Sequence, residues 1–202
     1  MMRPYASMLA LSVLALAGCA SNAPPQRFYS LSGGVDAGVP TTPPATVAPL
    51  YLELLAVTVP QQVSRNQLVV TTAPGRVELL EQERWIALPA AEIGQALSLG
   101  VSAQLGAIDV FRTPAPEQAP VYRISTHVQR FESAPGSYAL VDAVWSVRRV
   151  GSNTVLTCRT VANETVAAGY DALVAGHRRA VARIAADMAK GVRSVASGNA
   201  AC

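Results

Sequence analysis

The residues with the clearest chemical meaning are Leu16-Ala17-Gly18-Cys19, near the start of the chain. Leucine, two small residues and cysteine form a bacterial lipobox, in which a peptidase reaches the backbone past the small residues and the cysteine thiol accepts a diacylglyceryl group. The apolar run at 8–17 has the length of a secretory hydrophobic region and is too short to cross a bilayer. We therefore expect a lipoprotein signal peptide at 1–18 and lipidation at Cys19. The alternatives are an ordinary signal peptide with a chance cysteine, or an uncleaved anchor.

The mature chain would be held by more than one acyl chain, which gives stable membrane attachment where one chain does not. Removing residues 1–18 leaves 184 residues, enough for one domain with a sizeable core. The net charge falls from +3 to +2 because Arg3 is the only charge removed. This balance gives no argument for nucleic-acid binding. The arginine pairs at 148–149 and 178–179 suit either a stripe for acidic lipid headgroups or a solvated face.

Two cysteines remain for disulfide chemistry once Cys19 is acylated, namely Cys158 and Cys202. An oxidising periplasm and an even count favour a bond between them, which would tie the chain terminus to the strand around Cys158. The alternative is two unpaired thiols, with Cys202 on a loose tail.

The motifs of common enzymes are absent from the sequence, including the nucleophile elbow, the phosphate loop, the dinucleotide fingerprint, H-E-x-x-H and C-x-x-C. His127 lies in a predicted strand and His177 in a predicted helix, and neither has an evident nucleophile partner. Glu132 and Asp142 flank a hairpin turn and could form a carboxylate pair, but we expect them to be solvated. The sequence therefore predicts no enzyme, no cofactor and no metal site.

The segment that would join the anchor to the folded body is rich in proline and glycine. We expect residues 19–49 to form the lipid anchor and a tether of extended, polyproline-like composition, interrupted by a short strand at 27–31 whose aromatic residues dock on the main sheet. From Cys19 to Phe28 the chain spans about 30 Å when fully extended. The body would therefore lie close to the membrane.

The remaining chain reads as one α/β domain at 50–197, followed by a tail at 198–202. Helices are predicted from apolar residues at i, i+3 and i+4 spacing, and the second begins near Asp171. Pro135-Gly136 predicts the turn of a long hairpin, and the strand after it completes an antiparallel meander. Two helices on a sheet of five or more strands predict a mixed, partly antiparallel sheet flanked by two main helices. The predicted strands are 51–59, 67–72, 76–80, 108–111, 121–131, 138–147 and 155–166, and the predicted helices are 90–105 and a long C-terminal helix.

Several short motifs, in order, resemble the ABC-type transport auxiliary lipoproteins, the PqiC/YmbA-like family of Gram-negative bacteria. The order and spacing of these motifs are specific, and together they cover most of residues 28–190. Two segments depart from the family pattern: the tract at 33–49 is longer and richer in proline, and the tail at 198–202 has no counterpart. The motifs are Phe28-Tyr29-Ser30-Leu31, Val57-Thr58-Val59-Pro60 followed by Arg65-Asn66-Gln67-Leu68-Val69, Glu83-Arg84-Trp85 before the helix at 93–105, and Gly169-Tyr170-Asp171-Ala172-Leu173-Val174.

The resemblance implies a non-catalytic periplasmic lipoprotein of an MCE-type lipid transport system. In such systems an MCE-domain protein forms a tube from the inner membrane, and the lipoprotein docks its far end at the outer membrane. It also implies an α/β/α sandwich akin to the amino-terminal domain of TolB, and ring-like homo-oligomers would suit the docking role. Ala20 follows Cys19 in place of the aspartate that retains lipoproteins in the inner membrane, which favours the outer membrane.

Docking to a tube would use exposed apolar or aromatic residues, and the candidates are Trp85, Tyr138 and the loop at 60–66 with Arg65. Trp85 would otherwise be a core aromatic under the following helix. Arg65 would otherwise be a solvated loop charge or a cap on a nearby carbonyl. Two other functions remain open from the sequence: a lipid carrier holding an acyl chain between sheet and helix, and a structural envelope lipoprotein assisting another assembly.

Overall fold

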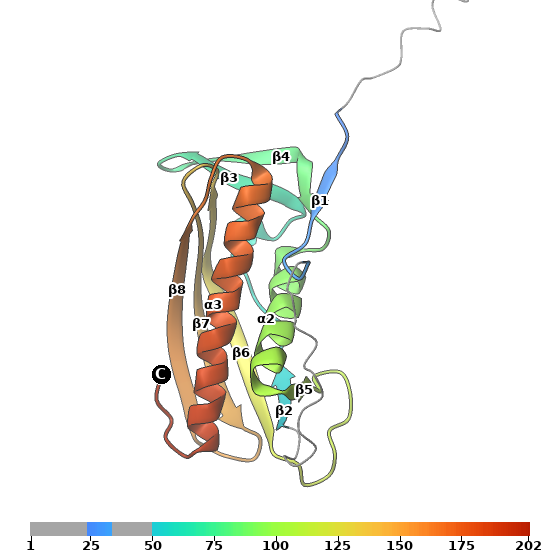
Figure 1. Cartoon of the computed structure of the whole chain (residues 1–202), viewed down its shortest axis with the longest axis vertical. Coiled ribbons are helices and arrows are strands. Elements are labelled where there is room, and N and C mark those ends of the chain that lie inside the picture. The colour runs from blue at the N-terminus through green and yellow to red at the C-terminus, as the bar shows by residue number, and fades with distance from the viewer. Residues whose placement is uncertain (1–23, 34–49) are drawn as a thin grey trace, which may run out of the picture.

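A computed structural model describes residues 24–33 and 50–202 (Figure 1). The predicted lipidation site Cys19, the signal peptide and the tract at 34–49 lie outside the described residues. The strands are β1 (Arg27–Tyr29), β2 (Leu50–Leu54), β3 (Gln67–Ala73), β4 (Arg76–Trp85), β5 (Ala107–Asp109), β6 (Val121–Ala134), β7 (Tyr138–Arg149) and β8 (Val155–Thr165). The helices are the short 3-10 helix η2 (Gln61–Val63), α2 (Pro89–Leu105) and α3 (Tyr170–Ala196).

The strands form two sheets. The larger has the order β5-β2-β6-β7-β8, with β2 parallel to both neighbours and β6, β7 and β8 antiparallel. The smaller has the order β1-β4-β3. The predicted class, α/β with a mixed and partly antiparallel sheet and two main helices, is confirmed, as is the meander of the three longest strands. The single continuous sheet is replaced by two, because the β3–β4 hairpin pairs with β1 and not with β2.

Both helices lie against the same face of the larger sheet. α3 packs on β7 and β8, α2 packs on β2 and β5, and the two helices contact each other along their length (Figure 1). This layering differs from the α/β/α sandwich that the resemblance implied. Among the described residues no helix covers the opposite face, which we call the open face.

The first strand joins the smaller sheet, which corrects the expectation that it docks on the main sheet. β1 pairs in parallel with β4, with Phe28 opposite Arg84 and Tyr29 opposite Trp85. Tyr29 and Leu31 are buried in the core, whereas Phe28 is exposed. The packed unit therefore includes residues that precede the predicted domain start at Leu50.

The strand predicted at 51–59 is regular only to Leu54. The following backbone remains beside β6 through isolated contacts: Leu55 N donates to Ile124 O and Thr58 N donates to Thr126 O. The chain therefore stops regular strand pairing after Leu54 but stays beside β6. The prediction was too long because the apolar run extends past the end of the regular strand.

A bulge in β6 decides which of its side chains reach the open face. The register shifts between Val128 and Arg130. Before the shift, even-numbered residues such as Val128 are buried on the helix side, and after it Phe131 and Ser133 take that side. An extra residue in one strand inverts the alternation beyond it. Arg130 and Glu132 are thereby turned to the open face.

Close approach of α3 to β7 depends on two glycines. A Cβ atom on Gly191 would lie 2.7 Å from the Trp145 ring, and one on Gly176 would lie 3.0 Å from Ala139 Cβ. Neither gap admits a side chain without displacement. The helix can therefore lie flat on the sheet only with glycine at both contacts.

Candidate interaction surfaces

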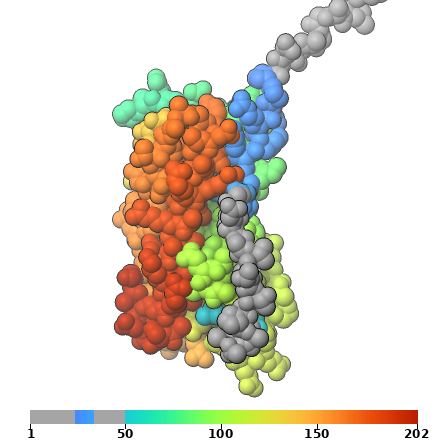
Figure 2. All heavy atoms as spheres, viewed as in Figure 1, coloured from blue at the N-terminus to red at the C-terminus, as the bar shows by residue number. Residues whose placement is uncertain are grey.

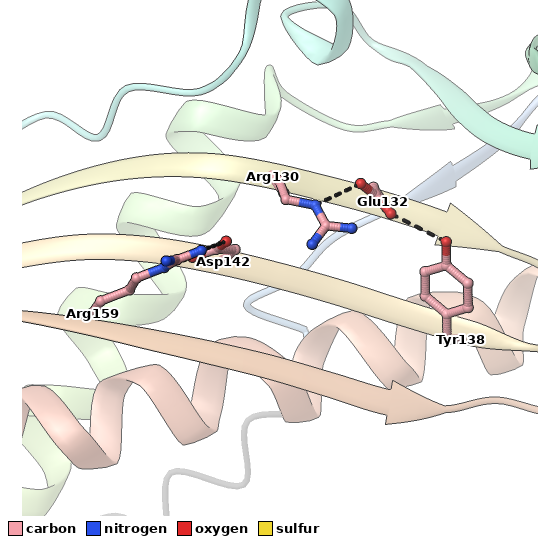
Figure 3. Close-up of polar contacts among 5 residues, drawn as sticks. All are labelled: Arg130, Glu132, Tyr138, Asp142 and Arg159. Atoms are coloured by element: carbon pink, nitrogen blue, oxygen red, sulfur yellow. Dashed lines mark hydrogen bonds and ion pairs between the residues drawn. The ribbon is translucent and has the colours of Figure 1, made fainter. Parts of the chain in front are cut away.

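A ladder of paired polar side chains crosses the open face of β6, β7 and β8 (Figure 3). Arg130 Nε donates to Glu132 Oε1 at 2.8 Å, and Tyr138 Oη donates to Glu132 Oε2 at 3.1 Å. The adjacent Arg130 guanidinium holds the pKa of Glu132 below its usual range. Burial, and then the hydrogen bond to Glu132, raise the pKa of Tyr138. The pair of glutamate and tyrosine thus keeps one fixed protonation state near neutral pH.

The second rung of the ladder is the pair of Asp142 and Arg159. Arg159 binds the carboxylate with two parallel bonds, Nε to Oδ1 at 2.9 Å and Nη2 to Oδ2 at 2.7 Å. The Asp142 side chain is 1% exposed and the Arg159 side chain 58%. The hydrogen bonds from Arg159 lower the pKa of Asp142, and the charge of Arg130 acts in the same direction. This two-pronged contact fixes the plane of the guanidinium group.

The burial of Asp142 corrects the expectation that both hairpin carboxylates are solvated. It also bears on their chemistry. A general acid at neutral pH needs a raised carboxyl pKa, whereas each of these carboxylates is held ionised by its own arginine. Glu132 and Asp142 therefore lack the separation of pKa values that an acid–base pair uses. The arrangement suits recognition: each arginine keeps unpaired donors that point to solvent.

The covered face of the same strands holds a neutral polar group instead. His177 on α3 is fully buried, stacks on Phe131 with ring centroids 4.2 Å apart, and meets Trp85 edge to face. Its Nε2 lies 2.8 Å from Ser133 Oγ, while its Nδ1 has no partner. Burial lowers the pKa of His177 to about 3. The ring is therefore neutral and has no solvent path, as a structural role requires.

The other histidine, His127, lies on the open face of β6, where its Nδ1 is 2.6 Å from Thr58 Oγ1. This contact holds the segment after β2 against β6.

The three predicted docking residues, Arg65, Trp85 and Tyr138, lie in different environments. Tyr138 is half-buried on the open face and belongs to the ladder. Trp85 is 2% exposed and packs against Phe131 and His177, so its prediction as a docking residue is wrong. Its alternative, a core aromatic, holds, although its neighbours lie on β6 and α3.

Arg65 follows η2 at the edge of the smaller sheet and is partly buried. Its backbone N donates to Val63 O, and its Nε is buried with no hydrogen-bond partner among residues 24–33 and 50–202. It is neither a fully solvated loop charge nor part of the polar ladder. Sequence reasoning missed the ladder arginines, Arg130 and Arg159. Arg130 lies two residues before Glu132 on β6, a spacing that puts both on one face, whereas only strand register brings Arg159 beside Asp142.

The structure joins Cys158 and Cys202 in a disulfide with Cα atoms 5.9 Å apart. Cys158 is buried on the covered side of β8, and the bond holds the end of the chain beside that strand (Figure 1). β8 is an edge strand of eleven residues, and a long free edge invites pairing with other chains. The tail therefore lies where it protects part of that edge.

A groove of about 610 Å³ opens at the start of α2. Its walls are the first turns of the helix, the segment after β2 and the loop after β5. The polar groups of Asp109 are already used, since Oδ2 accepts from Ser98 Oγ at 2.6 Å and Oδ1 accepts from Phe111 N at 3.0 Å. The remaining lining is mostly aliphatic, with Phe111 and Arg112 among the residues beyond β5.

Over residues 24–33 and 50–202 no group of three or more histidine, cysteine or acidic side chains is placed to hold a metal ion. Within the same residues, no helix has the length and apolar character needed to cross a membrane.

Comparison with known families places the chain. The model of the ABC-type transport auxiliary lipoprotein component matches residues 29–189, so the protein belongs to this family. The family is one of auxiliary transporter components. A comparison with curated proteins finds no match.

Solved structures share the fold at low sequence identity. An uncharacterized protein has a TM-score of 0.65 at 16% identity, covering 83% of this chain and 99% of its own. A DUF330 protein from Xanthomonas campestris has a TM-score of 0.54 at 14% identity, covering 72% and 85%. The PelC dodecamer from Paraburkholderia phytofirmans has a TM-score of 0.38 at 11% identity, covering 71% and 92%, a likeness too low to bear on this chain.

Proposed function

We propose that this protein is a lipoprotein anchored at the periplasmic face of the outer membrane, where it serves an MCE/ABC-type transport system for phospholipids as a non-catalytic accessory subunit. It would dock the tube of the MCE-domain protein to the outer membrane. The observation that carries this proposal is the family match over residues 29–189, together with the lipobox pattern at 16–19. The residue after Cys19 is alanine, which favours outer-membrane sorting.

The open face supports the docking role. Arg159 uses two of its N–H groups on Asp142, and its side chain is otherwise solvent-exposed. A guanidinium held in place by a buried carboxylate meets a partner with little loss of side-chain freedom, and arginine is enriched at interface hot spots. A partner surface with carboxylates or carbonyl oxygens would satisfy the remaining donors.

Self-association would fit the same role. A ring of identical subunits around the tube would present one open face per subunit, and we include such a homo-oligomer in the proposal. The number of subunits can be measured on the detergent-extracted lipoprotein.

Photo-crosslinking in intact envelopes tests the proposal. A crosslinking residue at Thr157, exposed on the open face of β8, should capture an MCE-domain protein, whereas one at Arg183, exposed on α3, should not. Arg159→Glu should weaken the capture at Thr157. The proposal fails if no such partner is captured and a deletion strain keeps normal outer-membrane permeability.

The groove at the start of α2 favours a second candidate, a periplasmic carrier that holds one acyl chain. Its volume of about 610 Å³ lies in the range of small-molecule sites, which are mostly apolar. Native mass spectrometry of the purified lipoprotein should then show bound lipid, and Ala91→Phe, which fills the groove, should remove it. Protein free of lipid in both forms would argue against this candidate.

A further inference from the structure

Three large apolar side chains lie exposed together where β1 meets the segment between β4 and α2. Ile86 N donates to Tyr29 O at 2.8 Å, so the two backbones lie side by side. Tyr29 and Trp85 point into the core, and neighbouring residues on extended chains point to opposite sides. Phe28 and Ile86 are accordingly 56% and 59% exposed. Leu88, also exposed, extends this anchor-side patch of Phe28, Ile86 and Leu88 toward the groove.

The patch includes Phe28 of β1, the first described strand after the expected anchor. Arg27 is only eight Cα–Cα steps beyond Cys19, so β1 begins within about 28 Å of the acylated residue even if the chain is fully extended. β1 also lies at one end of the long axis of the molecule (Figures 1 and 2). The bilayer that holds the acyl chains is therefore within reach of this patch, while the far end of the sheet stands away from it.

The charges around the patch are compatible with a lipid surface. Arg27 lies 3.6 Å from Glu83, and Arg84 lies 3.1 Å from Glu81. Glu83 and Glu81 are thus each matched by an arginine, which reduces their repulsion of anionic headgroups. Long arginine side chains can also reach headgroups while apolar neighbours enter the acyl boundary.

We propose that Phe28, Ile86 and Leu88 form a second membrane contact, which inserts into the leaflet that carries the acylated Cys19 and so fixes the orientation of the domain. This inference rests on the lipid anchor of the proposed function. With both contacts made, β6, β7 and β8 would extend away from the membrane. The open face would then be accessible to a partner beside the domain.

Fluorescence of the full-length acylated protein in vesicles tests the contact. Phe28→Trp is compared with Val155→Trp. Val155 is similarly exposed, at 51%, and is the first residue of β8, which begins at the other end of the long axis. Vesicles are made of phosphatidylethanolamine and phosphatidylglycerol with or without brominated acyl chains. Because Trp85 and Trp145 also emit, the spectrum of the parent protein is subtracted from that of each variant. The remaining emission of Phe28→Trp should shift to the blue and be quenched by bromine, while that of Val155→Trp should show neither effect. Adding Ile86→Glu should reduce the quenching of Phe28→Trp.

The outcomes separate the patch from the anchor. The mass of the mature amino-terminal peptide reports acylation independently. An unquenched Phe28→Trp on an acylated chain would overturn the patch and leave the anchor standing. A blue shift that depends on protein concentration and not on lipid would overturn it in favour of a second copy covering the patch. A chain without acylation would overturn both.

Discussion

The covered and the open face of the larger sheet each hold a buried titratable side chain, but in opposite charge states. On the covered face, His177 packs against Phe131 and Trp85, and burial lowers its pKa to about 3, so the ring is neutral. On the open face, Asp142 is equally buried but stays charged because Arg159 binds both of its oxygens. Burial by aromatic rings leaves only the neutral form, whereas burial beside an arginine keeps the ion.

The difference follows from what lies above each face. α3 covers one side and excludes water, so a charge there would have no solvent and no partner. The other side lets the arginine head remain in water while its carboxylate partner lies between strands. Charged recognition is therefore confined to the open face, and the covered face serves stability.

The largest effect is expected from opening the covered face. Trp85→Ala would leave a cavity beside Phe131 and His177 and lower the free energy of unfolding by about 3–5 kcal/mol in urea titrations. Phe28→Ala, an exposed aromatic one strand away, is the matched control and should change it by less than about 0.5 kcal/mol. Equal losses in the two variants would contradict the placement of Trp85 in the core.

Removing the Cys158–Cys202 disulfide should have the next largest effect on stability. Cys202→Ser frees the chain end from β8 and, for a closed loop of 44 residues, should cost about 2–4 kcal/mol of unfolding free energy. Mass spectrometry of non-reduced peptides supplies the direct check. Two free thiols there, or a variant as stable as the parent, would show that the bond does not form.

The pH dependence of stability should report His177. Its pKa is about 3 in the folded protein and near 6.5 when unfolded, so between these values the unfolded chain binds more protons. Stability is then complete above pH 6.5 and falls by about 2 kcal/mol on acidification to pH 5. The lowered pKa values of Glu132 and Asp142 act only at more acid pH.

His177→Gln keeps a hydrogen-bonding group near Ser133 and cannot titrate. Denaturant midpoints measured from pH 7 to 5 should therefore be nearly flat for this variant and sloped for the parent. An unchanged slope would place the titrating group elsewhere.

The smallest effects should come from the open face, where water shares the charges. Arg159→Ala leaves a buried carboxylate without its partner and should lower the denaturant midpoint, by less than either variant above because solvent shares the guanidinium charge. Arg130→Ala, beside the more exposed Glu132, should cost under about 1 kcal/mol. The order would be reversed in thermal melts if Glu132 were the buried carboxylate.

Much of the fold was predictable from local patterns. Pro135-Gly136 and the alternation on each side predicted the hairpin of β6 and β7, and Pro89 predicted the start of α2. Boundaries failed where tertiary pairing competes with the pattern. The apolar run after Leu54 reads as strand but makes only isolated bonds to β6. Phe28 and Trp85 look alike as aromatic docking residues, and one is exposed while the other is core.

The sequence by itself determined the lipobox, the family and the succession of strands and helices, because each depends on residues close together in the chain. Only the tertiary structure decided the two sheets, the layering of both helices on one face, and the pairing of Asp142 with Arg159. The bulge at Val128 and Arg130 shows the physical reason. One extra residue in a strand inverts every side chain beyond it, and whether that residue bulges is set by the partner strand and the core it must fill.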